Sequence, residues 1–85
     1  MKTIYKYVLE IKELQTISLT RGARIISVAN QHDKLFLWVQ VETGEEHEHR
    51  AIAIYGTGNP LPDNPGDFIG TVIIEPFVWH VFEIT

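Results

Sequence analysis

Apolar and polar residues alternate with a period of two along most of this sequence, and no stretch holds a helical period for long. Residues 34–42 show the pattern most clearly. One side of this segment is aliphatic and consists of Leu35, Leu37, Val39 and Val41. The other side carries Lys34, Phe36, Trp38, Gln40 and Glu42. Successive side chains of a β-strand point to opposite faces, so the segment predicts a strand with one buried face.

Turn residues divide the rest of the chain into segments of similar length. Further strands are expected at residues 3–11, 16–19, 23–29, 47–55, 68–75 and 77–84. Branched residues fall on both faces of segment 23–29, which predicts a central strand covered on both sides. Gly70 predicts a bulge or a close backbone approach within its strand. Short strands at this spacing predict an all-β fold: a single domain over residues 1–85, built as a small antiparallel β-sandwich or partly open barrel of six to seven strands.

Composition narrows the classes of function. The net charge is −4 and the seven Lys and Arg residues are dispersed, which argues against a general grip on nucleic acid. The longest apolar run, residues 72–74, is too short to span a membrane, and the first residues lack the apolar core of a secretory signal. The chain has no cysteine, which excludes disulfides and thiolate metal sites. The absence of cysteine also fits a reducing compartment, and the small size favours a homo-oligomer.

A glycine- and proline-rich segment between two expected strands raises the question of a phosphate site. Phosphate-binding glycine loops lead into a helix, whose free N–H groups meet the anion. Here Gly56, Thr57, Gly58 and Asn59 are followed by prolines at 60 and 62, which rule out that helix. Two interpretations remain: residues 56–59 form a backbone nest for an anion beside an arginine, or the segment only connects two strands.

Histidines provide the other candidates for chemistry. His47 and His49 share a strand face, so both could bind one metal ion, but the sequence shows no third ligand. An exposed hairpin arm is the simpler interpretation. We expect no metal and no cofactor. His80 shares a face with Val78, Phe82 and Ile84. A histidine on such an apolar face is most often a hydrogen-bonded core residue, and the alternative is a ligand contact or a general base.

Aromatic and basic residues complete a hypothetical ligand site. If the aliphatic side of segment 34–42 forms the core, Phe36 and Trp38 face outward and make an interface or a stacking platform. For a nucleotide-like ligand, Trp38 and Tyr55 would stack on the base. Arg24 or Arg50, with the N–H groups of residues 56–59, would hold the phosphates.

Four motifs carry a resemblance to a known family: KYVLE at residues 6–10, GTGNP at 56–60, FIGT at 68–71 and WHVFE at 79–83. The sequence resembles a family of short phage and prophage proteins described as a domain of unknown function. The resemblance implies a small accessory protein in the cytoplasm of a bacterial host. It further implies binding rather than catalysis, in antagonism of host defence, either by sequestering a nucleotide-derived signal or by binding a host protein.

Alternatives to the signal-binding function stay open. The outward aromatic face would suit a protein–protein inhibitor of a host factor or a small virion component. A small hydrolase would use His80 with Glu83 or an aspartate. Period two places residues 80 and 83 on opposite faces of a regular strand, which counts against direct cooperation between them.

Overall fold

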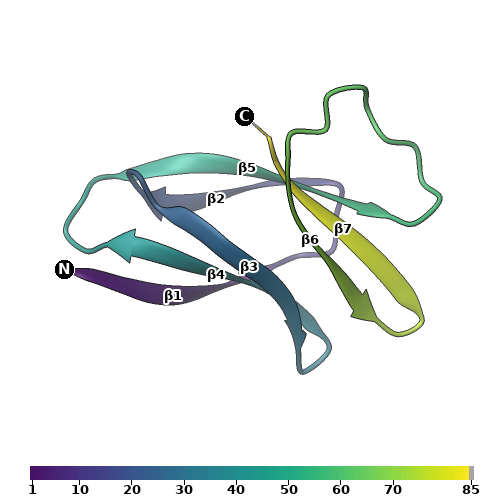
Figure 1. Cartoon of the computed structure of the whole chain (residues 1–85), viewed down its shortest axis with the longest axis horizontal. Helices are drawn as coiled ribbons and strands as arrows, with labels where there is room; N and C mark the ends of the chain where they lie inside the picture. Colours follow the sequence, from purple (N-terminus) through teal and green to yellow (C-terminus); the bar gives the residue numbers. More distant parts are fainter. Residues whose placement is uncertain (85) are drawn as a thin grey trace.

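The computed structural model describes residues 1–84 and shows two antiparallel sheets (Figure 1). The strands are β1 (Lys2–Leu9), β2 (Leu14–Thr20), β3 (Arg24–Gln31), β4 (Lys34–Glu42), β5 (His47–Gly56), β6 (Asp67–Ile74) and β7 (Phe77–Ile84). One sheet has the order β1-β4-β3 and the other has the order β2-β5-β7-β6. The predicted all-β fold is confirmed, and within residues 1–84 no helix is long and apolar enough to cross a membrane.

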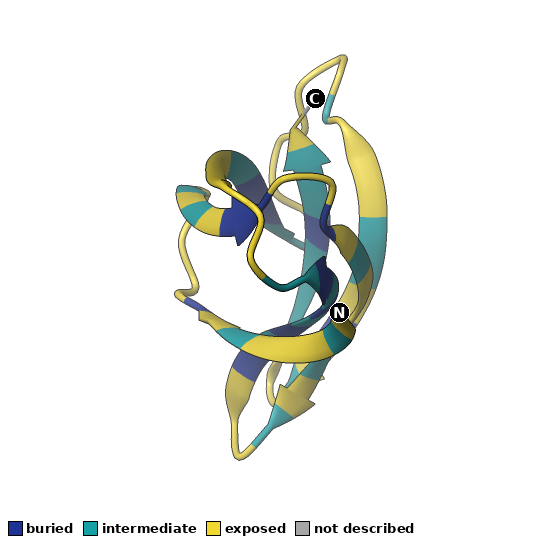
Figure 2. Ribbon diagram, turned by 90° about the vertical axis from the view of Figure 1, so that its left-hand side faces the viewer, coloured by how far each residue is buried: buried dark blue, intermediate teal, exposed yellow. Residues whose placement is uncertain are grey.

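The core lies between the two sheets, where Figure 2 shows the buried residues in dark blue. β4 is the middle strand of its sheet, and its four aliphatic side chains are at most 1% exposed, as its alternation predicts. They pack with Leu19, Ile52, Ile54, Val72 and Val81 of the opposite sheet. Each such side chain contributes roughly 1.5–3 kcal/mol through burial, which makes this interface the main source of stability.

The expected central strand at residues 23–29 is wrong, because β3 is an edge strand of the three-stranded sheet. Its pairing with β4 shifts between Ile25 and Ser27, so Ile26 is an extra residue in a β-bulge. Ile26 is 46% exposed. The two consecutive isoleucines therefore reflect the bulge rather than burial on both faces.

β3 lies beside β6, and this contact explains Gly70. The side-chain amide of Asn30 donates a hydrogen bond of 3.1 Å to the carbonyl oxygen of Ile73. A Cβ at Gly70 would lie 2.8 Å from Cγ1 of Val28, and the β6–β7 register shifts between Phe68 and Gly70. The sequence predicted a bulge or a close approach at Gly70, and the structure has a bulge at the preceding residue, Ile69, and the Val28 side chain close to the Gly70 backbone.

The core interpretation of His80 is wrong. Val81 is fully buried and Trp79 packs against the core, so the inner face of β7 belongs to the odd-numbered residues. His80 and Phe82 therefore lie on the outer face of the four-stranded sheet. The apolar residues next to His80 lie on this outer face as well. His80 is therefore within reach of a ligand that binds to the outer face.

Candidate functional site

His80 is fixed by a hydroxyl group at each ring nitrogen. β7 lies between β5 and β6, and the strand register places Tyr55 on one side of His80 and Thr71 on the other. The Thr71 hydroxyl is 2.9 Å from Nδ1, and the hydroxyl of Thr57, from the loop after β5, is 2.7 Å from Nε2. A hydroxyl both donates and accepts, so this arrangement holds either neutral tautomer or the imidazolium.

A small open cavity of about 250 Å³ surrounds His80. Its walls are mainly apolar and include Tyr55, Phe68 and Phe82. The ring of Phe82 meets those of Tyr55 and Phe68 edge-on, with centroids 6.0 and 5.4 Å apart. An apolar cavity with a few polar groups is the usual form of a small-molecule site, and this one lies just below the common size range of about 300–1,000 Å³.

The last residue of β5, Gly56, and the loop residues Thr57, Gly58 and Asn59 line the same cavity. The Thr57 N–H donates to the Val78 carbonyl at 3.2 Å, and the Asn59 N–H donates to the Gly56 carbonyl at 3.1 Å. Two of the N–H groups expected for an anion nest are therefore used inside the chain. The loop therefore connects two strands and also forms a wall of the cavity. Because two of its N–H groups already have partners, fewer are left to bind a phosphate.

Glycine at position 56 leaves room for a neighbouring side chain. A Cβ there would lie 3.0 Å from Nδ2 of Asn59 and 3.2 Å from Cζ3 of Trp79. The Asn59 amide therefore sits against the backbone of β5, next to the indole ring. Gly58 instead serves the turn itself, with a φ of 89° that favours glycine.

The predicted arginines lie elsewhere. Arg50 is on the inner face of β5, where its guanidinium holds the Glu83 carboxylate through Nε and Nη2 and donates to the Ala23 carbonyl at 2.9 Å. The hydrogen bonds to Glu83 raise the pKa of Arg50. Arg24 is exposed on β3 and Trp38 lies on β4, both in the other sheet. The structure thus gathers Tyr55, Gly56, Thr57, Gly58, Asn59 and His80, and leaves Arg24, Trp38 and Arg50 apart.

The family can be assigned from the whole sequence, since a domain of unknown function, DUF7352, matches residues 1–85. The chain belongs to the DUF7352 family. Searches of curated proteins and of solved structures found no match. The site of this DUF7352 protein is therefore interpreted from its own geometry.

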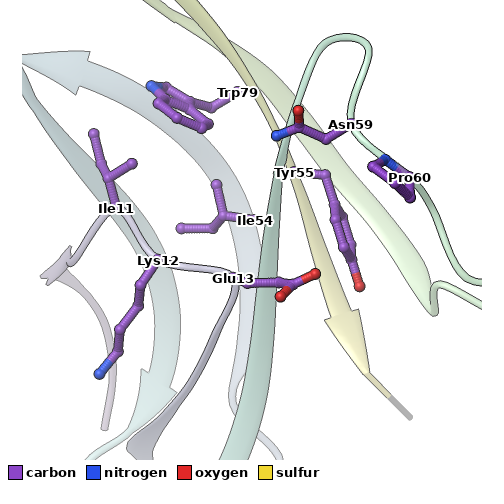
Figure 3. A pocket seen from close by; sticks show the side chains of 8 residues that line it. All are labelled: Ile11, Lys12, Glu13, Ile54, Tyr55, Asn59, Pro60 and Trp79. Carbon is purple, nitrogen blue, oxygen red and sulfur yellow. The ribbon is translucent and has the colours of Figure 1, made fainter.

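A second cavity of the DUF7352 protein, of about 380 Å³, shares Tyr55 and Asn59 with the first (Figure 3). The segment between β1 and β2 contributes Ile11, Lys12 and Glu13, and Trp79 lines it from β7. The sequence analysis gave Glu13 no role and quoted Trp79 only as part of the WHVFE motif. Glu13 and Trp79 line the same cavity because the segment between β1 and β2 lies close to β7. The spacing of residues along one strand does not show this.

Phe68, Thr71 and Phe82 line the His80 cavity and were not predicted as site residues, and for Thr71 a signal existed. The turn at residues 75 and 76 joins β6 and β7 directly. A two-residue turn pairs 74 with 77, and by continuation pairs 71 with 80, as the structure shows. The turn alone would therefore have placed the Thr71 hydroxyl beside His80.

No metal centre is apparent among residues 1–84, because no group of three or more His, Asp or Glu side chains with suitable geometry occurs there. His47 and His49 are exposed on β5 and point outward from the four-stranded sheet.

Proposed function

We propose that this protein is a non-enzymatic binding module that holds a small ligand with a planar aromatic body in the cavity around His80. The observation that carries the proposal is the convergence of Tyr55, Phe68, Phe82 and a doubly hydrogen-bonded His80 around one cavity. Aromatic walls favour stacking or edge contact with a planar group. The hydroxyl groups of Thr57 and Thr71 can each form a further hydrogen bond besides the one to His80, and these bonds orient the ligand.

The residues that line the cavity also limit the ligand. They include neither lysine nor arginine, so His80 is the one basic side chain among them. A ligand with several phosphates would have to leave most of them in solvent. A base or nucleoside unit held in the cavity, with at most one anionic group near His80, fits this chemistry better.

The biological role that we propose follows from the resemblance to short phage proteins. In that setting the protein would act in the cytoplasm of a bacterial host and sequester a small nucleotide-derived signal of antiviral defence. Support comes from the phage-like motifs together with the aromatic cavity that the GTGNP loop lines.

The direct experiment is calorimetry and thermal unfolding with a panel of cyclic and ADP-ribose-type nucleotides. A ligand present at 100 times its Kd stabilises the folded state by about 2.7 kcal/mol, which raises Tm by roughly 10–20 °C for a domain of this size. His80→Ala and Thr71→Val should abolish or weaken the response. Thr16→Val, an exposed position on β2 of the same sheet, is the matched control. A flat response across the panel contradicts the nucleotide proposal.

Chromatography of each nucleotide after incubation separates binding from catalysis. The 2.7 Å contact between the Thr57 hydroxyl and Nε2 of His80 has the geometry of a nucleophile and its base. If a product forms with the wild type and with neither Thr57→Val nor His80→Ala, the protein is a hydrolase and not a binding module. Recovery of unchanged nucleotide from the complex supports sequestration.

A protein–protein function is the second candidate, on the outer face of the three-stranded sheet. Phe36 and Trp38 lie there with ring centroids 6.2 Å apart, and the Lys6 ammonium is 4.7 Å from the Phe36 centroid. Ile4 and Val8 on β1 are 56% and 58% exposed beside them. Such a face suits a host protein, a virion component or a second copy of the chain. Trp38→Lys should then abolish a pull-down partner or shift the oligomer to monomer, whereas nucleotide binding at His80 should not change.

A further inference from the structure

The cavity of Figure 3 has polar groups that point to a ligand of different chemistry from the His80 cavity. The Glu13 carboxylate makes no hydrogen bond or ion pair within residues 1–84, and neither does the side-chain amide of Asn59. Figure 3 shows Glu13 entering from the segment between β1 and β2 and Asn59 from the loop after β5. The cavity therefore offers one free carboxylate and one free amide from opposite sides.

The charge of this cavity is not neutralised by its own lysine. Lys12 is the neighbour of Glu13, but its ammonium lies 3.1 Å from the Glu10 carboxylate. Figure 3 shows the Lys12 side chain directed away from Glu13. The lining holds one lysine and one glutamate, but only the Glu13 carboxylate is without a partner within residues 1–84, and it favours a hydrogen-bond donor or a cation.

The remaining walls favour a flat group. Trp79 lines the cavity from the inner face of the four-stranded sheet and Tyr55 from its outer face, and Ile54 closes the inner side. A carboxylate accepts two parallel hydrogen bonds from a planar group that carries adjacent N–H donors. Aromatic rings stack on such groups, and a guanidinium gains a further cation–π attraction.

From this arrangement we infer that the Glu13 cavity is a second binding site, which takes a planar group with two adjacent N–H donors. Glu13 accepts both donors, Asn59 contacts another edge of the group, and Trp79 covers one of its faces. A guanine base and an arginine guanidinium share this chemistry. The site goes beyond the proposed function, because it does not require a ligand at His80.

Nuclear magnetic resonance provides a site-specific test, because the chain has two tryptophans and hence two indole N–H signals. Trp79 lines the cavity, whereas Trp38 lies on the other sheet and is an internal reference. The probes are guanosine and an Nα-acetyl-arginine methylamide. Inosine, which lacks the 2-amino group, and the corresponding lysine amide are their controls. Trp38→Phe assigns the two signals.

The expected result is a saturable shift of the Trp79 signal with guanosine or with the arginine amide, and no shift of Trp38. A response to guanosine identifies a nucleobase as the source of the donor edge, and a response to the arginine amide identifies a side chain of a partner protein. Glu13→Gln should weaken binding about tenfold or more, since it removes a charged acceptor. Glu45→Gln, in the exposed turn after β4, makes the same change of charge elsewhere and should have no effect.

Three results would overturn the inference: no Trp79 shift with either probe, an equal shift with inosine or the lysine amide, or unchanged binding in Glu13→Gln. Thr71→Val keeps a failure here distinct from a failure of the proposed function. That variant alters the His80 cavity alone, because Thr71 does not line the Glu13 cavity. Loss of nucleotide binding in Thr71→Val, with the Trp79 response retained, would show that the two sites are independent.

Discussion

Replacing Arg50 by lysine should lower the stability of the protein strongly while leaving both cavities intact. Arg50 and Glu83 are only 19% and 16% exposed, and two nitrogens of the guanidinium hold the carboxylate. A third nitrogen donates to the carbonyl of Ala23, a residue that is 6% exposed. Lysine keeps the positive charge but has no planar fork, so it can satisfy only part of this arrangement.

The magnitude follows from the bonds that lysine cannot make. One hydrogen bond to Glu83 and the bond to the Ala23 carbonyl would be lost, and a buried acceptor without a partner is costly. Some water can enter, because neither side chain is completely buried. We expect a loss of about 2 kcal/mol in the free energy of unfolding. For a domain of this size the loss corresponds to a fall in Tm of roughly 8–16 °C.

Urea unfolding of the wild type and the variant measures this loss directly. Arg21→Lys is the matched control, because Arg21 pairs with Glu46 at 2.7 Å on the surface, where the two side chains are 65% and 80% exposed. A surface pair of this kind contributes about 0–1 kcal/mol. If Arg50→Lys costs no more than Arg21→Lys, the structural role of Arg50 is refuted. Unchanged stability together with lost nucleotide binding would restore the ligand role that the sequence suggested.

Three further predictions concern stability. Gly66→Ala should cost roughly 3 kcal/mol or more by urea unfolding, because Gly66 has a φ of 99° and a Cβ there would overlap the Glu83 carbonyl oxygen; a loss below about 1 kcal/mol would contradict this. The Met1 ammonium lies 2.6 Å from the Glu42 carboxylate and lowers the pKa of Glu42 below 4.5. The stability that this pair contributes is therefore present above pH 4.5 and is lost as pH falls through the lowered pKa. In Glu42→Gln, stability should depend less on pH in this acidic range. Burial raises the pKa of Tyr7 above 10.0, so stability should fall as pH rises past 10.0, and Tyr7→Phe should remove part of that fall.

Most of the strands could be predicted because alternation records burial directly. β4 shows this best, since all four aliphatic positions of its pattern are buried. The prediction failed for β3, where two adjacent isoleucines have the same pattern whether a strand is covered on both faces or contains a bulge. Only the partner strand distinguishes these cases, because a bulge is defined by two residues opposite one.

For the candidate site, too, the sequence shows which residues share a strand face, but it does not show which strands are neighbours. Tyr55, residues 56–59 and His80 meet because β5 and β7 are neighbours and the loop continues from β5. For Arg50 the sequence shows that the side chain shares a strand face with Ile52 and Ile54. An arginine on a buried face needs a partner for its charge. The identity of that partner required the pairing of β5 with β7, which sets Ile52 opposite Glu83 and brings Glu83 within reach of Arg50. Arg50 pairs with Glu83 on the inner face of β5, whereas His80 lies on the outer face of the same sheet, so the guanidinium is held away from the His80 cavity.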